Sequence, residues 1–454
     1  MTWKLLAAAS SFAILACTQT LGGPQPSSTI STGARSALQA GPMVGYSDMR
    51  EVMLWAQTTD SAAVHFVYWD TAAAGVRHST RSQVTSSGDA FTTKHAVTGL
   101  EPGKRYAYEV WLNGARVNLP HPLRFQTQQL WQWRTDPPSF RLALASCFFV
   151  NEAAYDRPGQ PYGGEYEILS AISRSRPDVM LWLGDNTYYR EVDWHSRSGM
   201  IRRFTHTRSL PELQPLLGAT HHYAIWDDHD FGPDNSDRSW YRKETALEVF
   251  RLFWGNPTFG VSDSPGVTTS FQWADVDFFL LDNRYHRAPN ARVTGERTLL
   301  GAAQFEWLID ALRTSRAPFK IVAIGGQVLN PVAEHETYAA VSPDERRRLI
   351  EAITREKITG VFFVTGDRHA SDLSRIERPG TYPLYDLTVS PLTAGVYSTA
   401  TENPSTVRGT LVTRRNFALL DFSGPRTNRV MRIALYGSDG QELWTRSVRA
   451  SELR

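Results

Sequence analysis

Cysteine is the scarcest residue in this 454-residue chain, which contains only Cys17 and Cys147. One available pair excludes a small domain held together by several disulfides. Cys17 closes an apolar N-terminal segment, and a lipid on that cysteine would leave Cys147 without a disulfide partner. An exported protein can keep one unpaired thiol if the thiol is deeply buried or bound to a metal.

Strong net charge and long apolar runs are also missing. The net charge is +2, which gives no reason to expect nucleic acid or an anionic membrane surface as a partner. Lysine supplies only 6 of the 48 basic residues, and we attribute this bias to codon usage rather than to phosphate binding. After the first segment no run is long and apolar enough for a transmembrane helix. The length predicts two folded units.

Residues 1–17 are predicted to be a signal peptide. Lys4 precedes an apolar run that ends at Cys17 and is too short to span a bilayer. The last four residues, Ile14–Cys17, resemble a bacterial lipobox, in which the cysteine becomes the lipid-modified N-terminus. A plain secretory signal with a chance cysteine is the alternative. We therefore expect an exported protein, either periplasmic or an outer-membrane lipoprotein that touches the membrane only through its lipid anchor.

Composition divides the remaining chain into three parts. Residues 18–40 are rich in Ser, Thr, Gly and Pro, which predicts a tether. Residues 41–130 contain short alternating or aromatic-rich runs between turn residues, which predicts an all-β domain. Its stretch 100–110 resembles the corner of fibronectin-type or immunoglobulin-like sandwiches, where a tyrosine hydroxyl binds the backbone. Residues 139–454 are predicted to be a catalytic domain of class α/β.

Within 139–454, apolar strand-like runs alternate with amphipathic helices. The runs are continuously apolar, as expected for strands buried on both faces, and include residues 140–146, 179–184, 222–226, 276–281, 319–324 and 360–366. Helical spacing of apolar residues predicts helices within 164–175, 243–255, 301–315 and 344–356. Ser342 and Pro343 are predicted to be the N-cap and first residue of the last helix.

Four of the apolar runs end at residues that bind metals in proteins. These residues are Cys147, Asp185, the run Asp227–Asp230, and the pair Asp367 and His369. Parallel strands that alternate with helices bring their C-terminal ends to one edge of a sheet, where ligands bind. The mixture of thiol, carboxylate and imidazole therefore predicts a polynuclear metal centre at that edge.

Each of these signals also has a simpler explanation. A Gly-Asp pair such as that at Asp185 is usually a turn, the run 227–230 could be a solvated loop, and His369 could be a core histidine. The carboxylates of the acidic run would repel one another unless a cation compensates. Asp367 and His369 are two residues apart, so an extended backbone would direct both to one centre or to two adjacent centres. Their joint occurrence favours the metal centre.

Four further residues are weaker candidates. Tyr188 lies three residues after Asp185 and could bind a hard trivalent ion. Asn186 could donate a hydrogen bond to a phosphate oxygen. Arg284 could orient a phosphate or pair with Asp282, and pairing is the more frequent arrangement. Gln327 could support a ligand through a hydrogen bond.

In combination and order, the motifs resemble those of the PhoD-type alkaline phosphatase/phosphodiesterase family of the calcineurin-like metallophosphoesterases. The motifs are VMLWAQT, ASC, WLGDNTYY, YAIWDDHDFG, LDNRYHR and VTGDRHASD, and they extend over nearly the whole mature chain. The resemblance implies a four-layer α/β sandwich of mixed sheets, preceded by an immunoglobulin- or fibronectin-like β domain. It also implies hydrolysis of phosphate esters with Fe³⁺ and Ca²⁺ as cofactors, other divalent ions being an alternative.

The same resemblance implies roles for individual residues. The residues that match iron-side or bridging ligands are Cys147, Asp185, Tyr188, Asp367 and His369, with Asp185 as the bridge. Asp228 stands at a metal-binding position where the wider superfamily has asparagine, and His229 matches the histidine beside the substrate phosphate. Most superfamily members have a carboxylate in place of Cys147 and a histidine in place of Asp367. The oxygen-rich second site fits calcium better than zinc.

The implied mechanism is in-line attack of a metal-bound hydroxide on the phosphorus of a small phosphate ester. His229 would protonate the leaving oxygen, and Asn186 and Arg284 would contact the substrate. The alternatives are a surface-tethered phosphodiesterase specific for nucleotides or phospholipids, and a degenerate phosphate-binding lipoprotein. The motifs do not separate monoesters from diesters, because that choice is expected to depend on loops such as 190–212 and 284–300.

Overall fold

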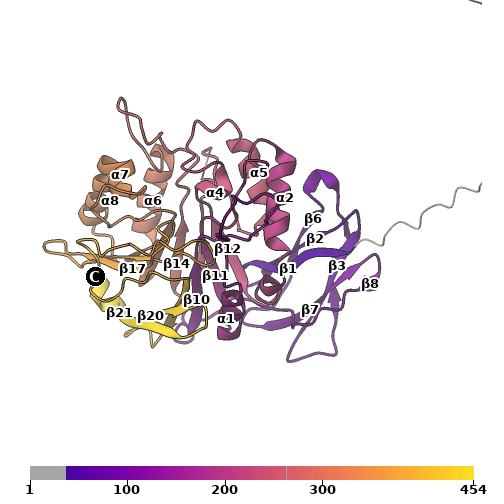
Figure 1. Ribbon diagram of the computed structural model, residues 1–454. Coiled ribbons are helices and arrows are strands. Elements are labelled where there is room, and N and C mark those ends of the chain that lie inside the picture. The colour runs from indigo at the N-terminus through magenta and orange to yellow at the C-terminus, as the bar shows by residue number, and fades with distance from the viewer. Residues whose placement is uncertain (1–36, 262) are drawn as a thin grey trace, which may run out of the picture. The chain divides into compact units, whose positions relative to one another are not determined.

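The apolar runs form the inner strands of two mixed sheets (Figure 1). This computed structural model describes residues 37–261 and 263–454, so the expected signal peptide, Cys17 and most of the expected tether lie outside the described residues. The parallel strands of the first sheet are β10 (Phe140–Ala145), β11 (Val179–Leu183) and β12 (His221–Ile225). Those of the second sheet are β14 (Val276–Leu280), β15 (Phe319–Ile324) and β16 (Val361–Thr365).

Further strands extend both sheets, most of them in antiparallel pairs. The nine-stranded first sheet has the order β21-β20-β19-β10-β11-β12-β1-β2-β6, and the six-stranded second sheet has the order β13-β14-β15-β16-β18-β17. The added strands are β1 (Leu38–Ser47), β2 (Glu51–Thr58), β6 (Thr92–Thr98), β13 (Thr269–Trp273), β17 (Asp372–Ile376), β18 (Leu384–Thr388), β19 (Asn416–Ser423), β20 (Val430–Gly437) and β21 (Glu442–Arg449). Both sheets are therefore mixed.

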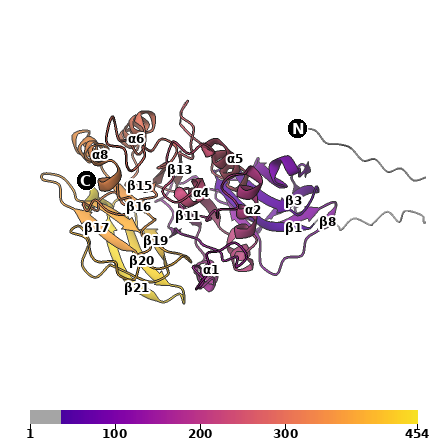
Figure 2. The same ribbon diagram turned by 45° about the horizontal axis from the view of Figure 1, so that its top comes forward.

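Alternation along the strands creates two apolar cores. Leu142 and Leu144 of β10 pack into the core that contains the second sheet, whereas Ala143 and Ala145 face the opposite core. Helices α1 (Glu167–Ser175), α2 (Arg197–Arg208) and α5 (Lys243–Phe253) cover the outer face of the first sheet. Helices α6 (Ala302–Thr314) and α8 (Pro343–Arg355) pack with the second sheet. Figures 1 and 2 show these two helical groups apart, so the layers run helices, sheet, sheet, helices.

The regular structure of residues 38–126 is β-strand, apart from one short 3₁₀ helix at Ser87–Asp89. Strands β1, β2 and β6 join the first sheet through a parallel pair of β1 with β12, in which Val44 lies opposite His221. A smaller sheet contains β3 (Ala63–Asp70), β4 (His78–Ser79), β5 (Gln83–Val84), β7 (Arg105–Leu112), β8 (Ala115–Arg116) and β9 (Arg124–Gln126). The Tyr106 hydroxyl accepts a hydrogen bond from the Glu101 backbone N–H at 3.1 Å, as expected for the corner. The likeness to immunoglobulin or fibronectin domains and the expected boundaries at 41–130 and 139–454 stay predictions.

The four predicted helices are present, but the long helix α2 and three short helices were not predicted. Residues 197–208, which we expected in a loop, form α2, whose N-cap Ser196 accepts a hydrogen bond from Gly199 N–H at 3.0 Å. Its buried face contains two arginines besides Met200 and Phe204, and buried charge hides the apolar periodicity on which the prediction depended. The remaining short helices are α3 (Gln214–Leu217), α4 (Asp228–Phe231) and α7 (Tyr338–Val341).

Helix α8 begins where predicted, but its cap differs from the expectation. Ser342 holds the N-cap position and Pro343 is the first helical residue. The Ser342 hydroxyl does not cap the helix, because it donates to the Arg297 carbonyl. Over residues 37–261 and 263–454, no helix combines the length and hydrophobicity that crossing a bilayer requires.

Candidate metal centre

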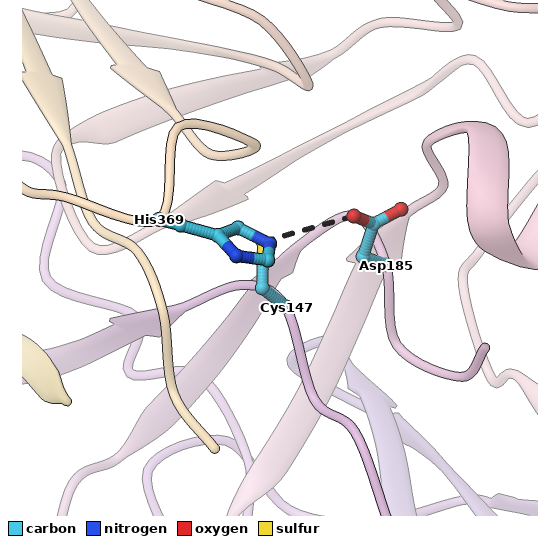
Figure 3. A group of neighbouring side chains, drawn as sticks. All are labelled: Cys147, Asp185 and His369. Atoms are coloured by element: carbon cyan, nitrogen blue, oxygen red, sulfur yellow. Dashed lines mark hydrogen bonds between the residues drawn. The ribbon is translucent and has the colours of Figure 1, made fainter. Parts of the chain in front are cut away.

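Four predicted residues lie at matching positions beyond four parallel strands. Cys147, Asp185, Asp227 and Asp367 each stand two residues after the last residue of β10, β11, β12 and β16, respectively. Because neighbouring parallel strands end at the same edge of a sheet, the shared offset brings Cys147, Asp185 and Asp227 together. Asp367 follows a strand of the second sheet, and its carboxylate lies within 4.8 Å of that of Asp227. Figure 3 shows the side chains of Cys147, Asp185 and His369 meeting from separate strand ends. The convergence expected from the sequence is therefore present.

The candidate ligands form three overlapping groups, each with its ligand atoms within 4.8 Å of one another. The groups are Cys147 with Asp185 and His369; Asp185 with Asp228 and His229; and Asp227 with Asp228 and Asp367. The Cys147 Sγ lies 3.7 Å from Asp185 Oδ2, the contact dashed in Figure 3. Asp185 and Asp228 each belong to two groups, so each is placed to bridge neighbouring cations.

The loops that carry these residues are strained. Cys147, Asp185, Asp367 and His369 all have left-handed backbone, with φ of 60°, 52°, 69° and 54°. This conformation costs roughly 1–2 kcal/mol per non-glycine residue, and such strain concentrates at functional sites. The extended backbone expected at Asp367 and His369 is therefore wrong. The two side chains enter different groups, which matches the expectation of two adjacent centres.

Glycines before two of the aspartates let the loops touch. A Cβ on Gly184 would lie 2.8 Å from the Asp227 Cβ, and Gly184 itself has a φ of 97°. A Cβ on Gly366 would lie 2.7 Å from Ser146 Oγ and 2.8 Å from the Leu183 carbonyl oxygen. Since real Cβ atoms do not approach this closely, the Gly-Asp pairs do more than form turns: they allow neighbouring strand ends to pack against one another.

Tyr188 contacts two members of the first group, of which Cys147 and Asp185 are buried. The Tyr188 hydroxyl donates to Asp185 Oδ2 at 3.2 Å and lies 3.2 Å from His369 Nε2. The Ser390 hydroxyl donates to the Cys147 sulfur at 3.2 Å. Burial raises the pKa of the Cys147 thiol to about 12, and burial with nearby acids raises the pKa of Tyr188 and of Asp185 well above their usual ranges. A thiolate, a phenolate and a carboxylate can coexist here only beside compensating positive charge.

Two carboxylates of the third group and two asparagine side chains have buried oxygens without a hydrogen-bond partner. Within the described residues, these atoms include Asp227 Oδ2, Asp228 Oδ1, and the Oδ1 atoms of Asn186 and Asn283. Leaving such an atom unpaired costs about 1–3 kcal/mol, and more for a charged group. Oxygen donors are the ligands of hard cations such as Ca²⁺. The unpaired oxygens and the thiolate-containing first group therefore fit a centre with one softer and one harder site.

The Arg284 side chain does not pair with Asp282, the partner expected from the sequence. Its guanidinium is 1% exposed, contacts Asp227 Oδ1 through Nε, and lies 2.7 Å from Glu336 and 3.6 Å from Asp228 Oδ1. Asp282 instead accepts the Arg284 backbone N–H at 2.8 Å. Burial under the carboxylates speaks against direct binding of a substrate. The fixed positive charge instead offsets part of the negative charge of the third group.

The structure adds Asp227 and Glu336 to the residues chosen from the sequence. The predicted ligand set took only Asp228 from the acidic run, yet the Asp227 carboxylate joins the third group and accepts the Asn283 amide at 2.8 Å. The acidic run Asp227–Asp230 indicated a metal site, but its sequence did not identify which of its side chains face that site. Glu336 has a left-handed backbone conformation, with a φ of 59°, and lies in a loop that contains none of the sequence motifs.

Asn186 has a different set of contacts from the one expected. Its amide Nδ2 donates to the Ile225 carbonyl at 2.7 Å and to Asp230 Oδ2 at 2.6 Å, so both N–H groups are used. Asp230 in turn accepts the Asp227 backbone N–H at 2.7 Å. These bonds hold the turn that presents Asp227 and leave no donor for a phosphate oxygen. Gln327 donates to Asp372 and Thr388 and is in none of the three groups.

His229 is a partly exposed member of the second group. Its side chain is 24% exposed, and its ring stacks on Tyr188 with centroids 4.2 Å apart. Its backbone N–H donates to Asp185 Oδ1 at 3.2 Å, and its Nε2 lies 3.7 Å from the exposed Asp234 carboxylate. The imidazole is therefore held beside Asp185 and Asp228 with one edge toward solvent.

The fold and the site together define a metallophosphoesterase-like protein. Comparison with solved structures agrees: "Structure of PhoD" matches with a TM-score of 0.73 and 16% identity over 90% of this chain and 92% of that chain. A purple acid phosphatase, PPD1, from yellow lupin (Lupinus luteus) seeds matches with a TM-score of 0.64 and 11% identity over 91% of this chain and 74% of that chain. At these identities the likeness concerns the fold alone.

The chain belongs to the PhoD-like phosphatase family, whose model matches residues 142–424. Residues 35–130 match a domain of unknown function (DUF7800). Alkaline phosphatase D of Bacillus subtilis (strain 168) is 24% identical over 329 residues, which are 61% of this chain and 53% of that protein. The chain thus spans about half the length of the curated relative that it matches.

The charge of the third group predicts a pH dependence for cation binding. Burial, followed by the Asp227, Glu336 and Asp228 carboxylates, raises the pKa of Asp367 to about 8. Below that pH a proton on Asp367 competes with a cation, so affinity should rise with pH by up to about tenfold per unit and level off above about pH 8. Calorimetric titration with Ca²⁺ across this range measures the slope. A flat profile between about pH 6 and about pH 8 would contradict the assignment of Asp367 as a ligand.

Proposed function

We propose that the chain hydrolyses phosphate esters with the help of bound metal ions. The observation that carries the proposal is the set of three overlapping donor groups, linked by Asp185 and Asp228, at the shared edge of the parallel strands. Membership of the PhoD-like phosphatase family supports the same reaction class. The expected substrate is a small phosphate ester, which would approach the centre beside the partly exposed His229.

The first group would hold Fe³⁺ and the third would hold Ca²⁺. Cys147, Tyr188 and His369 supply the softer and phenolic donors that suit a transition metal, whereas Asp227, Asp228 and Asp367 supply only oxygen. Asp185 would be shared between neighbouring ions. When bound, the cations supply Lewis acidity toward the phosphoryl oxygens and toward the attacking water.

The chain's own groups would position the ester and move a proton. His229, with its solvent-facing edge and its ring fixed against Tyr188, is placed to donate a proton to the leaving oxygen. Arg284 and Asn186 would act indirectly, since one offsets carboxylate charge and the other holds Asp230. Neither needs to touch the substrate for the site to work.

Export, lipidation and the identity of the N-terminal β region belong to the same proposal. A lipid on Cys17 would tether the enzyme in the periplasm or at the outer membrane. Residues 41–130 would form the immunoglobulin- or fibronectin-like domain expected from the tyrosine corner, and the Tyr106–Glu101 hydrogen bond supports this. Labelling with a fatty acid, compared between the parent chain and Cys17→Ser, tests the anchor. We expect only the parent to incorporate the label, and incorporation by both would contradict lipidation at Cys17.

Turnover of aryl phosphates tests the function directly. The purified chain should hydrolyse an aryl phosphomonoester, a bis-aryl phosphodiester or both, and should lose that activity to a strong chelator. Elemental analysis of the same sample gives metal identity and number. Turnover of the diester alone would favour the phosphodiesterase alternative. Phosphate binding with no turnover of either ester would favour the degenerate binding protein.

His229→Ala should slow poor leaving groups more than good ones. A general acid contributes roughly 10²–10⁴-fold, and its contribution shrinks when the leaving oxygen needs no proton. We therefore expect a large loss of kcat with an alkyl phosphate and a small one with a nitroaryl phosphate. The comparison is internal to one variant, so misfolding cannot imitate it. Equal losses for both esters would remove the proton-donor role.

A further inference from the structure

Tyr162 reaches the metal centre from a segment that no motif marks. Its hydroxyl lies 3.1 Å from His369 Nδ1, on the opposite side of the ring from Nε2, which lies 3.2 Å from the Tyr188 hydroxyl. The Tyr162 ring packs edge-on against Phe149, with centroids 4.9 Å apart, and is 43% exposed. A half-exposed tyrosine thus contacts a partly buried candidate ligand.

Three glycines make room for this arrangement. A Cβ on Gly395 would lie 2.5 Å from the Tyr162 ring. A Cβ on Gly163 would lie 2.7 Å from the Phe149 carbonyl oxygen, and one on Gly164 would lie 3.0 Å from an Arg415 nitrogen. Side chains at these positions would push the ring away from His369, so the local backbone is shaped around the position of Tyr162.

Arg415 ties the Tyr162 segment to the loop after β18. Its guanidinium donates to the Tyr162 carbonyl at 3.2 Å, to the Thr393 carbonyl at 2.9 Å and to Glu165 at 3.0 Å. Asn151 adds a reciprocal pair of hydrogen bonds with Gly163, both 2.8 Å long. The backbone that carries Tyr162 is therefore fixed by several hydrogen bonds.

We propose that Tyr162 is a positioning residue that orients His369 for metal binding. The proposal rests on the metal centre of the proposed function. A histidine that binds a cation through Nε2 carries its proton on Nδ1, and a hydrogen-bond acceptor at Nδ1 fixes the ring and makes Nε2 a stronger donor. Tyr162 Oη occupies that acceptor position. Removing such a partner typically weakens metal binding about 10–100-fold.

Titration of the chelator-stripped chain with Co²⁺ tests the proposal without using activity. A sulfur-to-cobalt absorption band reports an ion beside Cys147. We expect Tyr162→Phe, which keeps the ring and its packing, to weaken Co²⁺ binding at this band by about tenfold or more. The matched control is Tyr155→Phe, which makes the same chemical change at a 40% exposed tyrosine whose ring packs under Arg202. It should bind Co²⁺ as the parent does.

Melting temperatures in chelator separate positioning from packing. The two variants and the parent should melt together in chelator, and only Tyr162→Phe should gain less stability from Co²⁺. An unchanged Co²⁺ affinity in Tyr162→Phe would overturn the proposal and leave the Gly395 backbone, which also hydrogen-bonds the imidazole, as the sufficient partner. A lower melting temperature of Tyr162→Phe than of the parent in chelator would also overturn the proposal, because it would show that the hydroxyl stabilises the fold itself. A parent chain with no cobalt band would instead refute the metal centre itself.

Discussion

Replacing Asp185 by asparagine is expected to abolish turnover, by more than about 1,000-fold, and to deplete bound metal. Asp185 belongs to two of the three donor groups, so the loss of its charge weakens two neighbouring cation sites at once. Asparagine tolerates left-handed backbone better than most residues and keeps the shape of the side chain, so the φ of 52° can be retained. The change therefore isolates charge from fold.

Asp421→Asn is the matched control for this substitution. Asp421 pairs with Arg141 at 2.7 Å near the start of β10, which is the other end of the strand that leads to Cys147. Metal content from elemental analysis and turnover of an aryl phosphate should fall together in Asp185→Asn and stay near parental values in the control. Full activity in Asp185→Asn would show that the overlapping groups are not the reacting centre.

The convergence of the site was predictable because it follows from strand order rather than from detailed packing. A continuously apolar run shows where a buried parallel strand ends, and Cys147, Asp185 and Asp227 each stand at the same offset from the ends of neighbouring strands in the first sheet. The rule that parallel strands present their C-terminal ends together then places the side chains without knowledge of distances. This explains why the chain alone indicated that Cys147 and Asp185 lie close together, as they do in the structure.

The contacts of the third group could not be derived in the same way. Arg284 and Asp227 are adjacent only because β12 and β14 belong to different sheets that pack together, a relation that local patterns do not record. Glu336 and Tyr162 lie in loops, where no periodicity indicates the direction of a side chain. Helix α2 was missed for a related reason. Its buried face contains Arg203 and Arg208, so the sequence lacks the apolar periodicity that predicts a buried helix face.

Arg284→Met is the substitution expected to destabilise the fold most. The guanidinium is 1% exposed and contacts Asp227 and Glu336, with Asp228 3.6 Å away. Removing one partner of a buried ion pair typically costs about 3–5 kcal/mol, because the remaining charges stay buried without compensation. Methionine fills a similar volume, so the loss reports charge rather than a cavity. The denaturant midpoint should fall accordingly.

Cations provide the second half of this test. The carboxylates that Arg284 neutralises include two members of the third donor group, so a bound cation would offset part of the missing charge. The loss of stability in Arg284→Met should therefore be larger in chelator than in excess Ca²⁺. Arg197→Met, which breaks a partly exposed pair with Glu248 on α5, should cost no more than about 1 kcal/mol in either condition. If Ca²⁺ failed to narrow the gap between Arg284→Met and the parent, the carboxylates beside Arg284 would be a structural cluster rather than a cation site.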